Sequence, residues 1–111
     1  MAPFRLAAIH AIELYLNVWL LMDGIEPAVI RSLHHDLNKR ADMAQNSKLI
    51  LRVKTARHLA ILSEQRDYLV SRYAPDLLGT LTQRNRLETT MAEIAGKVTK
   101  RVVAHRKSAA A

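Results

Sequence analysis

The sequence predicts an all-α fold, an antiparallel up-and-down four-helix bundle made of one domain. Apolar residues recur at spacings of three and four along most of the 111 residues, and no stretch alternates at period two for long enough to form a strand. Half of the residues are hydrophobic, and only three are glycine and three proline, which is typical of a packed core with few loops. We expect one domain over residues 1–107 and a flexible tail over 108–111.

The first predicted helix runs from Pro3 to Asp23. A helix that is apolar on two sides is expected at the centre of a bundle, surrounded by the other helices. Gly24 suits a left-handed helix end, and Pro27 suits the first turn of the next helix. The apolar residues on the two sides are Leu6, Ile9, Leu16 and Trp19, and Leu14, Val18 and Leu21.

A second helix is predicted from Pro27 to Ala44, because apolar residues recur at spacings of 3, 4, 4 and 3. These residues are Ile30, Leu33, Leu37, Ala41 and Ala44. The polar opposite face, with Arg31, His34, Asn38 and Lys39, places this helix at the edge of the bundle.

Asn46-Ser47 predicts a helix stop followed by an N-cap, so that a third helix begins near Lys48 and continues to Ser71. Two apolar stripes are expected on it. The residues are Leu49, Val53, Ala56 and Ala60 in one stripe, and Leu59, Leu62 and Leu69 in the other. Pro75 then interrupts the helical pattern and turns the chain.

The fourth predicted helix, from Thr80 to Arg106, carries the most regular apolar stripe of the chain. Its members, at spacings of 4, 3, 4 and 4, are Leu87, Met91, Ile94, Val98 and Val102. Because the connections between the helices are short, we expect neighbouring helices to pack antiparallel.

Charge is concentrated near the C-terminus. The formal net charge is +7, and residues 84–107 contain seven basic residues against two acidic ones, a balance of +5. Such a positive end attracts phosphate-bearing partners through long-range, salt-dependent forces. The alternative is a solvated helix face that only keeps the protein soluble.

The chain has no cysteine, which excludes disulfides, thiolate metal sites and thiol nucleophiles and makes the cytoplasm the default location. The apolar run from Leu6 to Met22 is short for a membrane span, and His10, Glu13 and Asn17 interrupt it. We therefore expect a buried helix and no membrane association.

Glu13 lies in the most apolar helix, where an ionised carboxylate is costly unless a cation or hydrogen-bond donors reach it. His34, His35, Arg72 and Tyr73 are the expected partners. The alternative is a glutamate at the helix boundary whose carboxylate reaches solvent.

His34-His35-Asp36 resembles a metal-ligand cluster, but adjacent helical residues point about 100° apart and do not bind one ion together. We therefore expect no metal and no cofactor. A structural role is favoured instead, with His35 hydrogen-bonded in the bundle, Asp36 exposed and Leu37 in the core.

Arg52 and His58 are separated by five residues, the spacing that a group of metal-independent ribonucleases uses. Two such side chains can bracket a phosphate if a dimer partner supplies a second pair. The alternative is an exposed basic face. No glycine-rich phosphate loop or zinc-helix motif is present, so nothing in the chain demands an enzyme.

Three landmarks, in order, resemble the HEPN family, the nucleotide-binding helical domains of prokaryotes and higher eukaryotes. The segment from Ala11 to Asn17 resembles the family's apolar-flanked glutamate, and His35-Asp36-Leu37 resembles its His-Asp-Leu. Arg72-Tyr73-Ala74-Pro75 resembles its Arg-Tyr-Pro turn. The resemblance covers about residues 7–105 and implies a HEPN-like helical bundle.

The chain also departs from the family pattern. Asn17 stands where the family usually has lysine, and Ala74 is inserted before the proline. By the resemblance, we expect the family's usual first helix to be missing ahead of Met1. Ribonucleases of the family carry their catalytic arginine and histidine near the last helix, where this chain has Arg101 and His105 with only three residues between them.

The resemblance therefore favours a non-catalytic or accessory member that binds nucleotide or RNA phosphates. It implies a place in a toxin-antitoxin-type system, or beside a nucleotidyltransferase-like partner protein. The expected binding residues are Glu13, His35, Arg72, Tyr73, Lys97, Lys100 and Arg101. Two alternatives stay open.

The first alternative is a metal-independent endoribonuclease that uses Arg52 and His58, or Arg101 and His105. The second is a structural subunit whose first helix, with Tyr15 and Trp19 exposed, docks another chain. We expect a homodimer formed through this helix.

Overall fold

The computed structural model describes the backbone of residues 2–71 and 81–110 and the side chains of residues 7–63 and 85–107. The described part is helical and contains no β-strand, which confirms the all-α class. Its helices are α1 (Ala2–Met22), α2 (Pro27–Ser32), α3 (Leu37–Asn46), α4 (Val53–Ser71) and α5 (Leu81–Ala110). Residues 108–110, expected to be a tail, continue helix α5.

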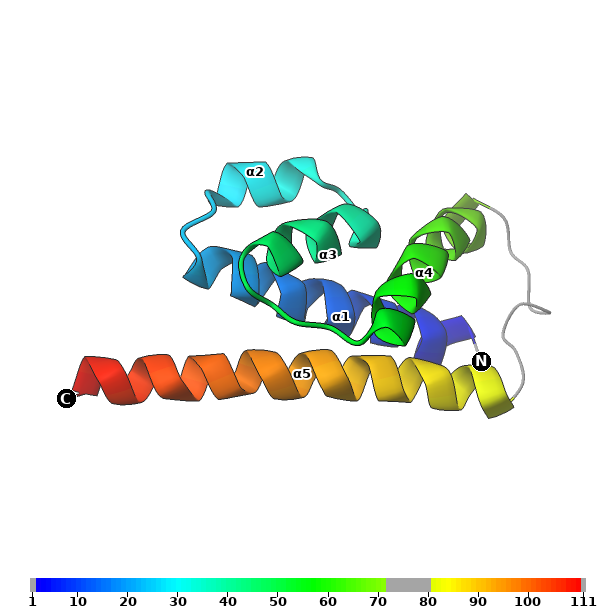
Figure 1. Cartoon of the computed structure of the whole chain (residues 1–111). Coiled ribbons are helices and arrows are strands. Elements are labelled where there is room, and N and C mark those ends of the chain that lie inside the picture. Colours follow the sequence, from blue (N-terminus) through cyan, green and yellow to red (C-terminus); the bar gives the residue numbers. More distant parts are fainter. Residues whose placement is uncertain (1, 72–80, 111) are drawn as a thin grey trace.

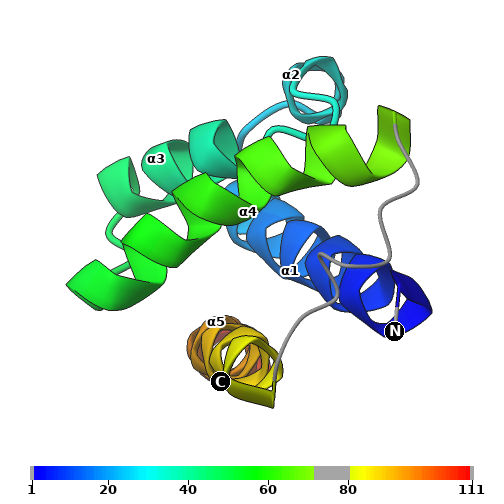
Figure 2. The same cartoon turned by 90° about the vertical axis from the view of Figure 1, so that its right-hand side faces the viewer.

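The longest element is α5, a helix of 30 residues that runs along the whole length of the protein (Figure 1). Helix α1 lies on α5 and runs in the same direction, as both views show (Figures 1 and 2). Helices α3 and α4 pack over another side of α1. The described helices therefore do not confirm the antiparallel four-helix arrangement.

Helix α1 ends as the sequence predicts. Gly24 has a φ of +86°, and the backbone N–H of Ile25 donates to the carbonyl of Leu20 at 3.0 Å, which is the Schellman end of a helix. Glu26 then occupies the N-cap of α2 with Pro27 directly behind it. The turn between α1 and α2 is short for this reason.

The single helix predicted from Pro27 to Ala44 is wrong, because the chain forms two helices with a turn over residues 33–36. His34 adopts a left-handed φ of +52°. Asp36 starts a new helix as its N-cap, with Oδ1 accepting the backbone N–H of Lys39 at 2.9 Å. Leu33 and Leu37 are both buried, so the apolar spacing continues across the break and hides it.

The third predicted helix begins five residues later than expected. Helix α3 ends at Asn46, the predicted stop signal and two residues beyond the predicted end at Ala44, and Ser47 closes that helix instead of capping the next one. Lys48 has a φ of +76°, and the N–H of Leu49 donates to the carbonyl of Ala44 at 3.0 Å. Residues 47–52 form a non-helical segment that lies against α5, and α4 starts at Val53.

The core is a single cluster to which α1, α3, α4 and α5 contribute. Most of the apolar stripe predicted on α5 is confirmed, because Leu87, Ile94 and Val98 are at most 2% exposed. On α4 the stripe with Val53 is wrong, since this residue is 68% exposed. The other residues at the centre of the core are Ile9, Ile12, Leu16, Leu20, Leu37, Ala44, Leu49, Leu59 and Leu62.

Helix α1 contacts α2, α3, α4 and α5, but part of its surface is exposed among the described residues. Ile9, Leu16 and Trp19 of its first stripe are buried, whereas the second stripe is on the surface. Leu14 is 50% exposed and Leu21 is 49% exposed. Helix α1 therefore lies centrally among the described helices, as expected, whereas its second apolar stripe is not buried among the described side chains.

Candidate functional site

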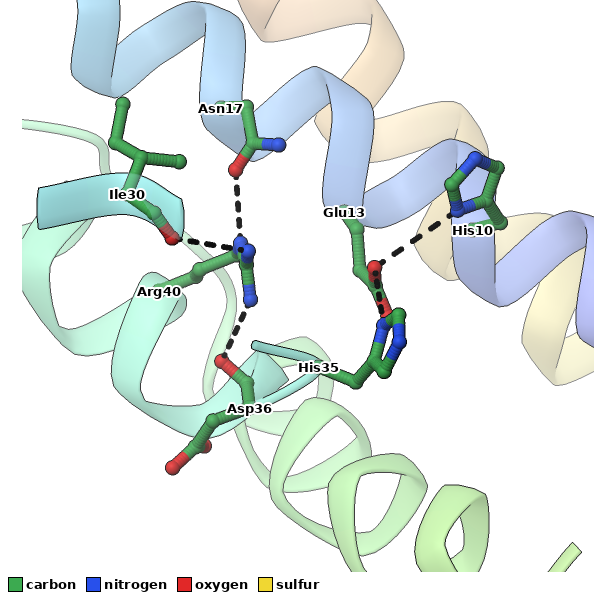
Figure 3. A network of polar contacts seen from close by, with 7 residues as sticks. All are labelled: His10, Glu13, Asn17, Ile30, His35, Asp36 and Arg40. Atoms are coloured by element: carbon green, nitrogen blue, oxygen red, sulfur yellow. Dashed lines mark hydrogen bonds and ion pairs between the residues drawn. The ribbon is translucent and has the colours of Figure 1, made fainter. Parts of the chain in front are cut away.

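Glu13 is buried and contacts a histidine from a distant part of the chain. Its residue is 4% exposed, and its Oε2 lies 3.2 Å from Nδ1 of His35 and 3.8 Å from Nδ1 of His10 (Figure 3). An imidazole N–H at this distance donates to the carboxylate. The predicted partnership of Glu13 with His35 is confirmed, and the solvent-exposed alternative is wrong.

The three residues of the His-Asp-Leu segment have separate structural roles. His35 reaches back to Glu13, Asp36 caps α3, and Leu37 is fully buried in the core. These are the predicted roles of His35 and Leu37, and Asp36 is exposed as expected. The segment therefore joins α1 to α3.

Arg40, which the sequence did not single out, completes this polar region. The residue is 4% exposed, and its Nε donates to Oδ1 of Asn17 at 2.8 Å (Figure 3). Its terminal nitrogens donate to the backbone carbonyls of Asp36 and Ile30, each at 3.4 Å. The guanidinium thus connects α1, α2 and the start of α3, and it satisfies carbonyls at the break between the two short helices.

Two of the predicted binding residues, Arg72 and Tyr73, lie outside the described residues. Asn17, on α1, accepts a hydrogen bond from Arg40. The sequence signal for this buried cation is an arginine at an apolar-facing position of the second predicted helix.

Three cations of the C-terminal region, Lys97, Lys100 and Arg101, lie where residues 47–52 meet α5. Three adjoining cavities of about 430, 300 and 530 Å³ open there. Lys48 and Arg101 line the first two cavities, Lys97 and Lys100 line the last two, and Arg52 completes the third. We call these five residues the basic groove. The sequence predicted three of them as binding residues, but not Lys48 or Arg52.

Arg101 is held in place at one end of the basic groove. Its guanidinium carbon lies 4.4 Å from the ring centroid of Trp19, and its Nη2 donates to Oδ1 of Asp23 at 3.2 Å. The hydrogen bond from the Ser47 side chain has the largest part in lowering the pKa of Asp23, and the hydrogen bond from Arg101 lowers it further. Within the described residues, the buried Nη1 of Arg101 has no hydrogen-bond partner. Trp19 is 8% exposed, so its predicted exposure is wrong.

At the other end of the basic groove, Glu93 joins α5 to the start of α4. Its Oε2 accepts the backbone N–H of Arg52 at 3.0 Å, and its Oε1 accepts the hydroxyl of Thr55 at 2.5 Å. Lys97 contacts the same carboxylate at 2.8 Å and also donates to the carbonyl of Ile50. Burial raises the pKa of Glu93, but these hydrogen bonds outweigh it and bring the pKa to about 2. An acid on α5 thereby caps the first turn of α4.

In each of the two predicted ribonuclease pairs, the arginine and the histidine lie in different surroundings. Arg52 precedes α4 and lines the basic groove, whereas His58 lines a separate cavity of about 390 Å³ and contacts the Thr90 hydroxyl at 2.6 Å. Arg101 is engaged by Asp23, while His105 is exposed on α5. The ribonuclease reaction stays a prediction.

Among the described side chains, no three histidine, aspartate or glutamate residues lie together as a metal site requires. No helix within residues 2–71 and 81–110 is long and apolar enough to cross a membrane.

Comparison with known proteins returns no match. A scan against protein-family models finds no matching family, and no curated protein or solved structure matches the chain. The geometry of the chain itself is therefore the basis for a functional assignment.

Proposed function

We propose that this protein is a phosphate-binding helical module that takes nucleotide or RNA in the basic groove. The observation that carries the proposal is the convergence of Lys48 and Arg52, from residues 47–52, with the cations of α5 around three adjoining cavities. Cavities of this size are typical of small-ligand sites.

The charge of the groove supports an anionic ligand. Glu93 and Asp23 pair with two of its five cations, Lys97 and Arg101. Lys48, Arg52 and Lys100 leave an excess of three positive charges around the cavities. Phosphate groups are the anions that such clusters of lysine and arginine attract most strongly.

The kinship with HEPN domains is part of the same proposal. The bond between Glu13 and His35 supports it, because it joins two of the three landmarks that resemble the family. The third landmark, from Arg72 to Pro75, lies outside the described residues. In this proposal the Glu13 region maintains the fold, and the basic groove binds the ligand.

We further propose a non-catalytic or accessory role, beside a nucleotidyltransferase-like or antitoxin-type partner. The last helix does not carry the arginine-to-histidine spacing of the family's ribonucleases. Fold kinship alone does not establish this role, so ligand binding is the property to test first.

Calorimetric titration with ATP and with a short single-stranded RNA, at low and at moderate salt, tests the proposal. We expect binding that weakens as salt rises, because phosphate contacts release counterions. The variant Lys48→Gln/Lys100→Gln removes two groove cations and should weaken binding by about tenfold or more and lower the salt slope by about 2.

The matched control is Arg31→Gln/Lys39→Gln. It removes the same charge from exposed positions on α2 and α3. Equal weakening in both variants would show that the ligand responds only to net charge. No heat from either ligand at both salt concentrations would remove the proposal.

A further inference from the structure

The three cavities of the basic groove form a row. The cavity of about 300 Å³ shares Lys48 and Arg101 with the first cavity and Lys97 and Lys100 with the third, whereas the first and the third share no lining residue. The smallest cavity therefore lies between the other two, and we call it the middle cavity. It opens where residues 47–52 run alongside α5 (Figure 1).

The middle cavity is apolar apart from its four cations. Among the described residues, its other lining side chains are Trp19, Leu49, Ile50 and Ala104. Ile50 is 79% exposed, the largest exposed fraction among the large hydrophobic side chains of the described residues. The outer two cavities differ, because each contains a carboxylate, Asp23 in the first and Glu93 in the third. An apolar cavity between two polar ones fits a ligand whose apolar part lies between two charged parts.

Contacts within the chain hold the walls of the middle cavity in place. The Trp19 ring donates through Nε1 to the carbonyl of Ser47 at 3.3 Å, and the Arg101 guanidinium lies over the same ring. Lys97 donates to the carbonyl of Ile50, which fixes residues 47–52 against α5. A cavity whose walls are fixed in advance loses little conformational entropy when a ligand enters it.

The cations of the groove are divided between the two sides of the middle cavity. The first cavity has two cations and one acid, Asp23, and the third has three cations and one acid, Glu93. Positive charge is therefore in excess on both sides. An internal nucleotide of a strand has one phosphate before it and one after it, each with one negative charge. A nucleoside triphosphate or an anionic lipid carries its charge at one end only, so it would leave the cations of one outer cavity unmatched.

We propose that the middle cavity binds one unpaired base of a single-stranded nucleic acid, and that the outer two cavities hold the phosphates before and after this base. The inference rests on the proposed function, because it concerns the same groove, and it selects a strand over a mononucleotide. Aromatic rings and arginine planes are surfaces on which proteins stack unpaired bases, and Trp19 and Arg101 both line the middle cavity. The bases of a duplex are already paired and stacked, so a duplex cannot place one there.

Calorimetric titration of the whole chain with four ligands at one salt concentration tests the base site. The ligands are a single-stranded RNA of about six uridines, an abasic ribose-phosphate strand of the same length, an RNA duplex of the same length, and ATP. We expect the single strand to bind about tenfold more tightly than the abasic strand, which is within the range for the stacking of one base. It should also bind more tightly than the duplex and than ATP.

Ile50→Ser places the base in the middle cavity, because it removes an exposed apolar wall without changing the charge of the groove. The ratio of the affinities for the single strand and the abasic strand should fall from about tenfold to about threefold or less. The matched control is Val53→Ser. Val53 is 68% exposed, and it lines none of the three cavities. This control should keep the tenfold ratio.

The outcomes separate the base site from phosphate binding. Equal affinities for the single strand and the abasic strand would overturn the base site, although the binding of both would still support the proposed function. ATP or a duplex that binds as tightly as the single strand would overturn it as well. So would a ratio that Ile50→Ser leaves unchanged or that Val53→Ser lowers as much. No heat from any of the four ligands would remove the proposed function and this inference with it.

Discussion

Nδ1 of His35 lies 3.2 Å from the buried carboxylate of Glu13, although 22 residues separate them in the chain. This contact joins the centre of α1 to the turn before α3. It also explains why an acid is tolerated in the most apolar helix, because a hydrogen-bond donor offsets part of the cost of burying the carboxylate.

Removal of His35 should destabilise the fold more than removal of its neighbour. We expect His35→Ala to lower the free energy of unfolding by about 1–3 kcal/mol, because the buried carboxylate loses a donor. His34 and His35 are both exposed, so His34→Ala is a matched control and should change it by less than about 0.5 kcal/mol. Urea denaturation of both variants measures the difference. Equal effects would mean that the Glu13 contact adds nothing to stability.

Substitution of Lys48 by glycine should raise the stability of the fold and lower its affinity for RNA. Its left-handed φ of +76° is unfavourable for any residue with a Cβ, so Lys48→Gly should stabilise the fold by about 1 kcal/mol. The same change removes a cation from the basic groove and should weaken RNA binding. Thermal unfolding and calorimetry measure the two effects.

Lys48→Ala is the control for this prediction, because it removes the cation and keeps the Cβ. It should bind RNA as weakly as Lys48→Gly without the gain in stability. Unchanged binding in both variants would exclude Lys48 from the ligand site.

Glu93 should make stability depend on pH in the acid range. Its pKa is about 2 in the folded protein and 4.5 when unperturbed, so the carboxylate stabilises the fold above pH 4.5. That contribution is lost as the pH falls from 4.5 to about 2. After allowance for solvent screening, we expect it to be about 1–2 kcal/mol.

Glu93→Gln tests this prediction by removing the titrating group while keeping most of the shape. Its free energy of unfolding should decline less steeply between pH 4.5 and 2 than that of the unaltered protein. Parallel pH profiles of the two proteins would show that the hydrogen bonds at the start of α4 do not hold the carboxylate in its charged form.

Arg101 should control the environment of the chain's single tryptophan. Arg101→Ala removes the cation over the Trp19 ring and the bond to Asp23, so it should destabilise the fold by about 1–2 kcal/mol and shift the tryptophan emission to the red. Lys100→Ala, at the exposed neighbouring position, should leave the emission unchanged. Identical spectra for the Arg101 variant and the unaltered protein would contradict the stacked geometry.

Local features of the fold could be predicted from the sequence where the signal is itself local. The periodic stripe on α5 predicts its buried face, and Gly24 with Pro27 predicts the turn after α1. The cost of a buried acid predicts a polar partner for Glu13, and His35 is one of the four expected partners. Each of these depends on residues whose own chemistry limits where they can lie.

The missed features depend on contacts between distant segments. Nothing near Ser47 indicates that Glu93, on α5, caps the first turn of α4. The break before Asp36 was hidden because Leu33 and Leu37 keep a helical spacing across it. Lys48 and Arg52 join the basic groove only because residues 47–52 lie against α5. Sequence patterns report local periodicity, whereas these positions are set by tertiary packing.

The fluorescence of Trp19 offers the most direct test of the basic groove, since this residue lines two of its three cavities. Titration with a short RNA at several salt concentrations should change the emission in a saturable way. The logarithm of the affinity should fall linearly with that of the salt concentration. The slope should be shallower in Lys48→Gln/Lys100→Gln. An emission that does not respond to RNA at any salt concentration would contradict phosphate binding at this groove.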